Sequence, residues 1–120
     1  KLILEYRKLF KDLKIIKMFT SEFDDHVSFH LAVVQIDFKA LKTTRADVMQ
    51  QLKEKGIGTQ YHYIPIYRHP CFSDSTQDVS DYFPEMETYY KEALSLPLYE
   101  DLTLKEVQEI VRLLEKVLRL

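Results

Sequence analysis

The C-terminal segment, residues 103–120, carries one apolar stripe at helical spacing. Thr103 and Glu106 form a Thr-x-x-Glu capping box at its start, which supplies acceptors for the amide groups that a first helical turn leaves without partners. The stripe consists of Leu104, Val107, Ile110, Val111, Leu114, Val117 and Leu118. We therefore predict a closing helix, and such a helix is stable only when its apolar face is buried against other elements.

The preceding residues alternate between helical and extended patterns. Apolar spacing and capping residues predict further helices over residues 1–13, 45–55 and 84–92. Runs of β-branched and aromatic residues predict strands over 27–38, 57–64 and 94–98, and a brief strand or an extended segment over 14–20. The run 27–38 is typical of a strand covered on both faces, and Pro97 makes the last strand an edge or terminal one. Polar residues and prolines predict loops at 21–26 and 65–82.

This order of elements predicts an α/β or α+β fold, in which helices pack on a small sheet of three or four strands. Thr44 and Asp47 form a capping-box variant before helix 45–55, and Gly56 suits a left-handed C-cap after it. The length of 120 residues fits one domain, 1–120. Residues 1–13 lack a start methionine and mix charged with apolar side chains, so we expect a piece of a longer protein that begins within a connecting helix.

Charge and glycine content exclude several classes of protein. Lys and Arg total 17 and Asp and Glu total 19, so the net charge is −2 and no basic excess favours nucleic acid or a membrane surface as a partner. The 2 glycines, Gly56 and Gly58, are too few for a Walker A loop or a GxGxxG fingerprint. No apolar run approaches the roughly 20 residues that span a bilayer, so we expect no membrane segment.

Cysteine and histidine usage argues against a disulfide or a metal centre. Cys71 has no second cysteine to pair with, which favours a reducing compartment, the cytoplasm. Among the 4 histidines only His26 and His30 are four residues apart, and they lie in a predicted loop and strand rather than on one helix, so we expect no metal site. We expect His30 to be hydrogen-bonded within a buried strand. His69 and Cys71 are expected to be ordinary loop side chains, because side chains two apart on an extended chain rarely form a nucleophile pair.

The densest group of chemically active side chains is segment 61–69, Tyr-His-Tyr-Ile-Pro-Ile-Tyr-Arg-His. It follows a predicted strand, where binding groups commonly gather. Arg68 is suited to bidentate contact with phosphate, and phenols can stack on a base or hydrogen-bond a sugar. Strand alternation would place Tyr61 and Tyr63 on one face and His62 on the other. The alternative is that these tyrosines are half-buried core side chains with their hydroxyl groups in water.

The predicted helix 84–92 carries weaker signals. Tyr89 and Tyr90 indicate core packing at helical spacing. Glu85 and Glu87 indicate charges that favour a helix N-terminus, rather than a pair of acid and base catalysts.

Four motifs lie in a distinctive order along the chain. They are His30-Leu31 in an apolar strand, Gly56-Ile57-Gly58-Thr59-Gln60-Tyr61-His62-Tyr63-Ile64-Pro65, Phe83-Pro84, and Leu94-Ser95-Leu96-Pro97-Leu98 followed by Leu102-Thr103. Together they closely resemble the C-terminal part of the DegT/StrS-type nucleotide-sugar aminotransferases, over nearly the whole chain. Within that family the chain is most similar to the 4-aminotransferases of the pseudaminic acid branch, which act on UDP-linked 4-keto-6-deoxy-N-acetylhexosamines.

The resemblance implies a fold-type-I enzyme that uses pyridoxal 5′-phosphate to transfer an amino group, usually from glutamate, to a keto sugar for surface polysaccharide or glycan synthesis. It implies that this chain is the C-terminal small domain, that a preceding large domain carries the Schiff-base lysine, and that the full-length enzyme is a homodimer. Ser28-Phe29-His30 is similar to the tripeptide before that lysine, but the lysine position holds Val33. We therefore expect no catalytic residue, no cofactor and no aminotransferase activity in this chain alone.

The resemblance also places the His-Tyr-x-Pro segment on the substrate side of the active site. His62 and Tyr63 are the first candidates for contacts to the sugar or diphosphate, and Tyr67 and Arg68 are the second. The alternative function is a free-standing α/β regulatory or protein-interaction module whose tyrosine-rich edge binds a partner. A severed enzyme domain should expose a sizeable apolar patch, whereas a free-standing module should not.

Overall fold

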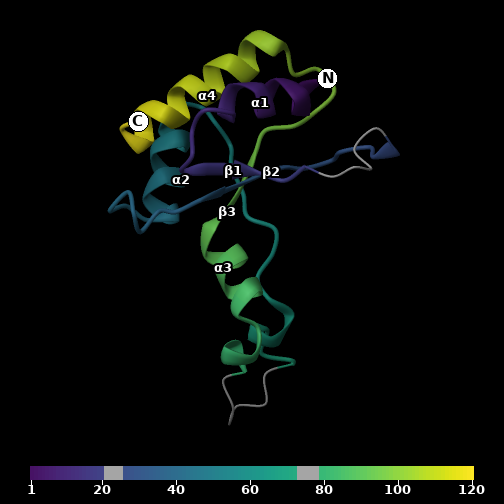
Figure 1. Ribbon diagram of the computed structural model, residues 1–120, viewed down its shortest axis with the longest axis vertical. Helices are drawn as coiled ribbons and strands as arrows, with labels where there is room; N and C mark the ends of the chain where they lie inside the picture. Colours follow the sequence, from purple (N-terminus) through teal and green to yellow (C-terminus); the bar gives the residue numbers. More distant parts are fainter. Residues whose placement is uncertain (21–25, 73–78) are drawn as a thin grey trace.

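The computed structural model describes residues 1–20, 26–72 and 79–120, and its centre is a three-stranded antiparallel sheet (Figure 1). The strands are β1 (Ile16–Met18), β2 (Ala32–Ile36) and β3 (Ala93–Leu96), in the order β1-β2-β3. Ile16 pairs with Ile36 and Ala32 pairs with Leu96. β2 is therefore the central strand, and β3 lies at an edge, as Pro97 predicted.

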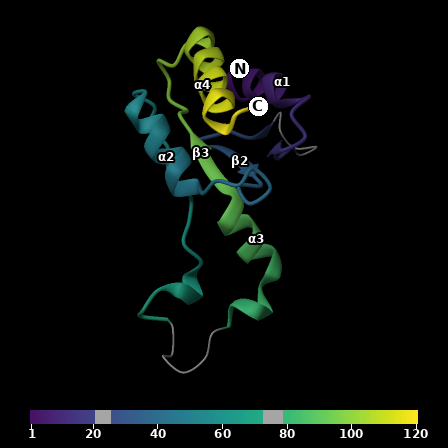
Figure 2. The ribbon, with the colours of Figure 1, turned by 90° about the vertical axis from the view of Figure 1, so that its left-hand side faces the viewer.

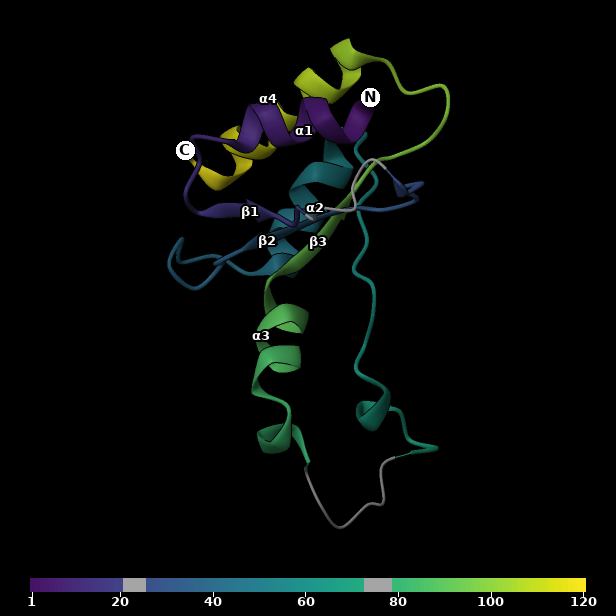
Figure 3. The ribbon, with the colours of Figure 1, turned by 45° about the vertical axis from the view of Figure 1, so that its right-hand side comes forward.

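Four helices accompany the sheet in the described parts of the chain. They are α1 (Leu2–Phe10), α2 (Arg45–Glu54), α3 (Pro84–Glu92) and α4 (Leu104–Leu118). α1 and α4 lie side by side over the sheet, and α2 contacts α4 (Figures 1 and 3). Their apolar faces form one core with the inward-facing side chains of the sheet. The predicted fold class, helices on a three- to four-stranded sheet, is confirmed with three strands.

Fully buried side chains join the two ends of the chain within this core. Tyr6 on α1 is inaccessible to solvent, stacks on Phe10 and donates its hydroxyl to the Pro97 carbonyl at 2.9 Å. The predicted stripe of α4 faces the same core, with Leu114 inaccessible as well. The predicted capping box is also present, because Thr103 Oγ1 accepts from the Glu106 amide at 3.2 Å and Glu106 accepts from the Thr103 amide at 2.7 Å.

Removing this cap is expected to destabilise the fold measurably. Thr103→Ala should lower the free energy of unfolding by about 1 kcal/mol, because an amide of the first turn of α4 loses its acceptor. Urea-induced unfolding measures the change. Thr43→Ala is the matched control, since the Thr43 hydroxyl makes no hydrogen bond to any described residue. A loss from Thr103→Ala no larger than the control loss would show that the cap contributes nothing.

The strand predicted over 27–38 is shorter than expected, and in this chain only one of its faces is fully covered. Ala32, Val34 and Ile36 are inaccessible, whereas the alternate residues are only half-buried. His30 precedes β2 and is exposed, so the prediction of a buried, hydrogen-bonded His30 is wrong. The partner strands limit the length of β2, because β1 has 3 residues and β3 has 4.

The strand predicted over 57–64 does not form. Gln60 exchanges two backbone hydrogen bonds with Ser95, at 2.7 and 3.2 Å, as an isolated bridge beside β3. Beyond it the chain leaves the sheet, so residues 61–64 take part in no ladder of strands. Gly56, by contrast, adopts the predicted left-handed conformation after α2, with φ of +79°.

Two segments of chain run away from the sheet and return, and together they form a projecting arm (Figures 1 to 3). We define the arm as residues 59–72 and 79–92. It contains the short 3-10 helices η2 (Ile66–Arg68) and η3 (Ser80–Tyr82) as well as α3. The described part of the predicted loop 65–82 therefore belongs to the arm, while residues 73–78 and most of the predicted loop 21–26 lie outside the described residues.

The arm exposes several large apolar side chains, each at least 40% accessible. They are Tyr63, Ile64, Ile66, Phe72, Tyr82 and Phe83. Such a patch is unusual for a surface that contacts only water. None of the helices in the described ranges has the length and hydropathy needed to cross a lipid bilayer.

Candidate functional site

His62 lies at the base of the arm and is held from two sides. Its Nδ1 lies 2.8 Å from the hydroxyl of Ser95 on β3. Tyr89 on α3 donates its hydroxyl to the His62 carbonyl at 3.0 Å, and burial raises the pKa of that phenol above its ordinary value, which keeps it a neutral donor. The sheet and α3 therefore determine together where the imidazole lies.

Tyr63 presents its side chain to solvent, with 67% of its surface accessible. Its ring lies edge-on against the ring of His62, with 4.6 Å between the centroids. The prediction that strand alternation places these two side chains on opposite faces is wrong, because residues 61–64 do not form a strand. Tyr61, which was grouped with Tyr63, is instead half-buried against Tyr90. The half-buried alternative thus describes Tyr61 and not Tyr63.

Tyr67 and Arg68 converge on a carboxylate that sequence reasoning had assigned to a helix terminus. Glu87 on α3 is only 7% accessible. Its Oε1 accepts from the Tyr67 hydroxyl at 2.8 Å and from Arg68 Nε at 3.0 Å, while its Oε2 accepts from Arg68 Nη2. Lys91 approaches the same carboxylate at 3.8 Å, and Tyr67 stacks on Phe83. Glu87 is therefore the central residue of this cluster, and the interpretation of it as a helix N-terminal charge is incomplete.

The cluster around Glu87 has defined protonation states. Hydrogen bonds from Arg68 and then from Tyr67 hold the pKa of Glu87 below its ordinary value. Burial, followed by the hydrogen bond to Glu87, raises the pKa of Tyr67. At physiological pH the carboxylate is ionised and the phenol is neutral. The bidentate ion pair occupies Nε and Nη2 of Arg68, although 43% of that side chain remains accessible.

Acid is expected to weaken the attachment of η2 to α3. Because the pKa of Glu87 is lowered in the folded state, its ion pair contributes fully above the ordinary carboxyl pKa and is lost as the pH falls through the folded-state value. Hydrogen exchange of amides in 66–68, measured between about pH 6 and pH 3, should show protection decreasing toward acid. Glu87→Gln should flatten this dependence, while Glu85→Gln, an exposed change on the same helix, should not. Equal pH dependence in Glu87→Gln and the unmodified protein would contradict the assignment.

The four predicted substrate residues form two pairs, and α3 contacts both of them. His62 contacts Tyr63, Tyr67 joins Arg68 through Glu87, and α3 supports both pairs through Tyr89 and Glu87. No hydrogen bond, ion pair or ring contact within the described residues joins one pair to the other. The two pairs are therefore connected through α3, which contacts each of them.

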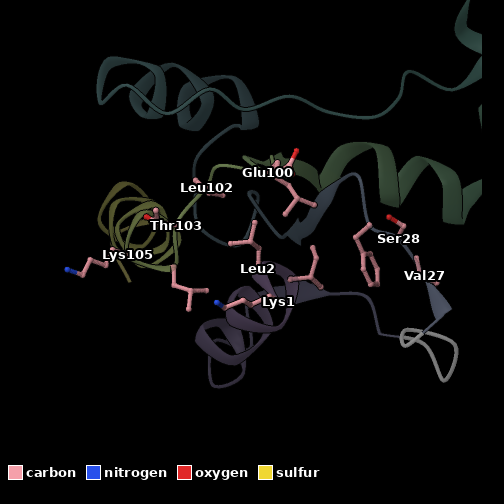
Figure 4. A pocket seen from close by; sticks show the side chains of 12 residues that line it. Lys1, Leu2, Val27, Ser28, Glu100, Leu102, Thr103 and Lys105 are labelled. Atoms are coloured by element: carbon pink, nitrogen blue, oxygen red, sulfur yellow. The ribbon is translucent and has the colours of Figure 1, made fainter.

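The predicted residues do not line any of the described pockets. Five pockets of about 540 to 900 Å³ lie elsewhere. The largest lies between the starts of α1 and α4, where Leu2, Leu102 and Thr103 face residues 27–29 (Figure 4). Pro84, Met86 and Tyr89 of the arm line another of the five pockets, whereas the four predicted residues line none of them. A ligand bound at those four residues therefore needs a second surface to enclose it.

The described side chains also limit which cofactor chemistry this chain supplies. No group of three His, Cys, Asp or Glu residues in the described ranges is placed to hold a metal ion. Every lysine lies among the described residues and every one is exposed. A Schiff-base lysine is normally desolvated so that its amine is neutral and nucleophilic. No lysine of this chain is desolvated in that way.

Solved structures share this fold. PseC of Helicobacter pylori, an aminotransferase involved in pseudoaminic acid biosynthesis, aligns with a TM-score of 0.76 and 23% identity over 98% of this chain and 31% of PseC. DesI, solved in the presence of its TDP-sugar product, aligns with a TM-score of 0.76 and 21% identity over 98% of this chain and 29% of DesI. The chain therefore shares its fold with about a third of each of these structures.

The family follows from the sequence match. The model of the DegT/DnrJ/EryC1/StrS aminotransferase family matches residues 1–115, and the chain belongs to this family, as its motifs indicated. SpsC, a spore coat polysaccharide biosynthesis protein of Bacillus subtilis (strain 168), is 32% identical over 97 residues, which is 80% of this chain and 25% of SpsC. The chain thus spans about a quarter to a third of the length of these relatives.

Proposed function

We propose that this chain is the C-terminal small domain, 1–120, of an enzyme that transfers an amino group from glutamate to a UDP-linked 4-keto-6-deoxy sugar for surface polysaccharide or glycan biosynthesis. The observation that carries the proposal is the family match over 1–115, combined with the accessible phenol of Tyr63 and the imidazole of His62 beside it on the arm. The TDP-sugar product of DesI favours a sugar attached to a nucleotide as the substrate, and the name of SpsC favours polysaccharide biosynthesis.

The cofactor of this enzyme is pyridoxal 5′-phosphate, and the small domain does not carry its Schiff-base lysine. The exposure of every lysine supports the assignment of the Schiff-base lysine to the large domain. In the proposal the large domain supplies the reactive amine, α1 belongs to the helix that connects the two domains, and the small domain alone is inactive. The full-length enzyme is a homodimer that acts in the cytoplasm, without a metal ion and without a nucleic-acid or membrane partner.

His62 and Tyr63 contact the sugar or diphosphate in this proposal. The accessible phenol of Tyr63 and the imidazole beside it can both donate hydrogen bonds to hydroxyl or phosphate oxygens. Tyr67 and Arg68 add a second contact, which Arg68 makes with the part of its side chain that Glu87 does not engage. The ion pair with Glu87 orients that guanidinium before the substrate binds.

The exposed side chains of the arm favour an enzyme domain over a free-standing module. Ile64, Ile66 and Phe72 are accessible and apolar, and Ile64 and Ile66 adjoin the proposed contact residues Tyr63 and Tyr67 in the chain. A protein surface of this kind normally contacts another protein surface. In the proposal the large domain or the second subunit covers it and encloses the substrate at the same time.

Amination of a defined keto sugar by the full-length protein tests the proposal. Purified full-length protein loaded with pyridoxal 5′-phosphate should convert a UDP-linked 4-keto-6-deoxy-N-acetylhexosamine and glutamate to a 4-amino sugar and 2-oxoglutarate, both detectable by mass spectrometry. A TDP-linked analogue tests nucleotide choice, and the isolated chain 1–120 should be inactive. Amination by the isolated chain, or no amination of any nucleotide-linked keto sugar by the full-length protein, would disprove the proposal.

A further inference from the structure

Arg45 occupies the junction between the body and both segments of the arm. It is the first residue of α2 and follows the N-cap Thr44. Its guanidinium carbon lies 4.1 Å from the ring centroid of Tyr61, on the outgoing segment, and 4.9 Å from that of Tyr90, on the returning segment. The two rings meet edge to face with centroids 5.9 Å apart. One cation therefore contacts both segments where they leave the sheet.

The same guanidinium also caps the returning helix. Arg45 Nη1 donates to the carbonyl of Tyr90 and, at 3.2 Å, to the carbonyl of Ala93. These carbonyl groups lie at the C-terminal end of α3, where helix carbonyls lack intrahelical partners and the helix dipole is negative. A lysine ammonium is a point charge and does not combine planar stacking on two rings with donation to two carbonyl groups.

The contacts of Arg45 adjoin those that hold the proposed substrate residue. Tyr61 precedes His62 in the chain, and Tyr90 follows Tyr89, which donates to the His62 carbonyl. Arg45 thus links the two residues that flank the His62–Tyr89 hydrogen bond. A change at Arg45 would move that bond relative to the sheet without any direct contact between Arg45 and a ligand on the arm.

We propose that Arg45 is a positioning residue, which sets the place of His62 and Tyr63 relative to the body and thereby controls the affinity for the sugar substrate. The inference rests on the proposed function. Because the contacts of Arg45 with the arm and with the Ala93 carbonyl adjoin His62, its loss should affect the step that binds the keto sugar. The transfer of the amino group from glutamate to the cofactor should be unaffected.

Kinetics of the two half-reactions test this role in the full-length enzyme. Arg45→Met keeps the length of the side chain and removes its charge and donors, and it should raise KM for the UDP-linked keto sugar about 10-fold with kcat within about 2-fold. Arg45→Lys should give an intermediate KM. Arg112→Met is the matched control, because Arg112 is exposed on α4 and, among the residues that the structure describes, pairs only with Glu109. An unchanged KM, or an equal loss in the glutamate half-reaction, would overturn the proposal.

Hydrogen exchange of the full-length protein tests the same role without activity. In Arg45→Met the amides of Gln60 and Ser95, which pair with each other beside His62, should exchange about 10-fold faster, while α4 amides are unchanged. Unchanged exchange at Gln60 and Ser95 would overturn the proposal whatever the substrate. If Arg45→Met loosens this bridge but the unmodified enzyme aminates no keto sugar, the proposed function fails and the positioning role of Arg45 stands.

Discussion

Replacing His62 by asparagine is expected to lower kcat/KM for the UDP-linked keto sugar about 100-fold in the full-length enzyme. An asparagine side chain places a polar atom where Nδ1 lies, so the contact with Ser95 is kept while the Nε2 end of the imidazole is lost. The factor of 100 corresponds to about 2.7 kcal/mol, within the range for a hydrogen bond to a charged group. Steady-state kinetics with saturating glutamate measure the change.

Matched variants separate this effect from general damage to the arm. Tyr63→Phe removes one accessible hydroxyl and should lower kcat/KM about 10-fold, whereas Tyr99→Phe, which removes an exposed hydroxyl on the body, should change nothing. His69→Ala is the control for His62, because His69 is exposed and lies elsewhere on the arm. Unchanged KM and kcat in both His62→Asn and Tyr63→Phe would show that the substrate assignment is wrong.

Truncating Leu114 is expected to produce the largest loss of stability among these variants. Leu114 is inaccessible at the centre of the α4 stripe, within the core shared by α1, α2 and the sheet. Leu114→Ala should lower the free energy of unfolding by about 2–5 kcal/mol, because it removes buried methyl groups and leaves a cavity that the surrounding helices fill only in part. Urea-induced unfolding of the 120-residue chain measures the loss.

An exposed leucine provides the comparison. Leu4 on α1 is 65% accessible, so Leu4→Ala should change the free energy of unfolding by no more than about 0.5 kcal/mol. If Leu114→Ala cost as little as Leu4→Ala, α4 would not be part of the core. The cavity argument would then fail for this helix.

The elements that could be predicted are those with signals inside their own segment. α4 has its capping box and stripe, and α2 has the Thr44 cap and the left-handed Gly56. The motifs likewise led to the family that the match over 1–115 shows. The strand predicted over 57–64 failed because β propensity describes residues that suit a pleated surface, and it does not say whether a partner strand is present. Beyond Gln60 no described strand pairs with that segment.

The candidate site was predicted only in part, because only some of its residues lie close together in the sequence. The density of phenols and imidazoles in 61–69 is visible in the sequence, and it directed attention to His62 and Tyr63. Glu87 was missed as the partner of Tyr67 and Arg68, because it lies 20 and 19 residues away and its own neighbours suggest a helix N-terminus. Its burial and ion pair exist only once α3 returns beside η2.

The amino-acid sequence by itself determined the helices, their caps, their apolar faces and the family, because each depends on side chains within a few turns of one another or on motifs in a fixed order. Only the tertiary structure decided which polar groups meet across the arm. Arg45 reaches the carbonyls of Tyr90 and Ala93 over separations of 45 and 48 residues. Contacts at such separations depend on where the folded core sends the chain, and no local preference for helix or strand contains that information.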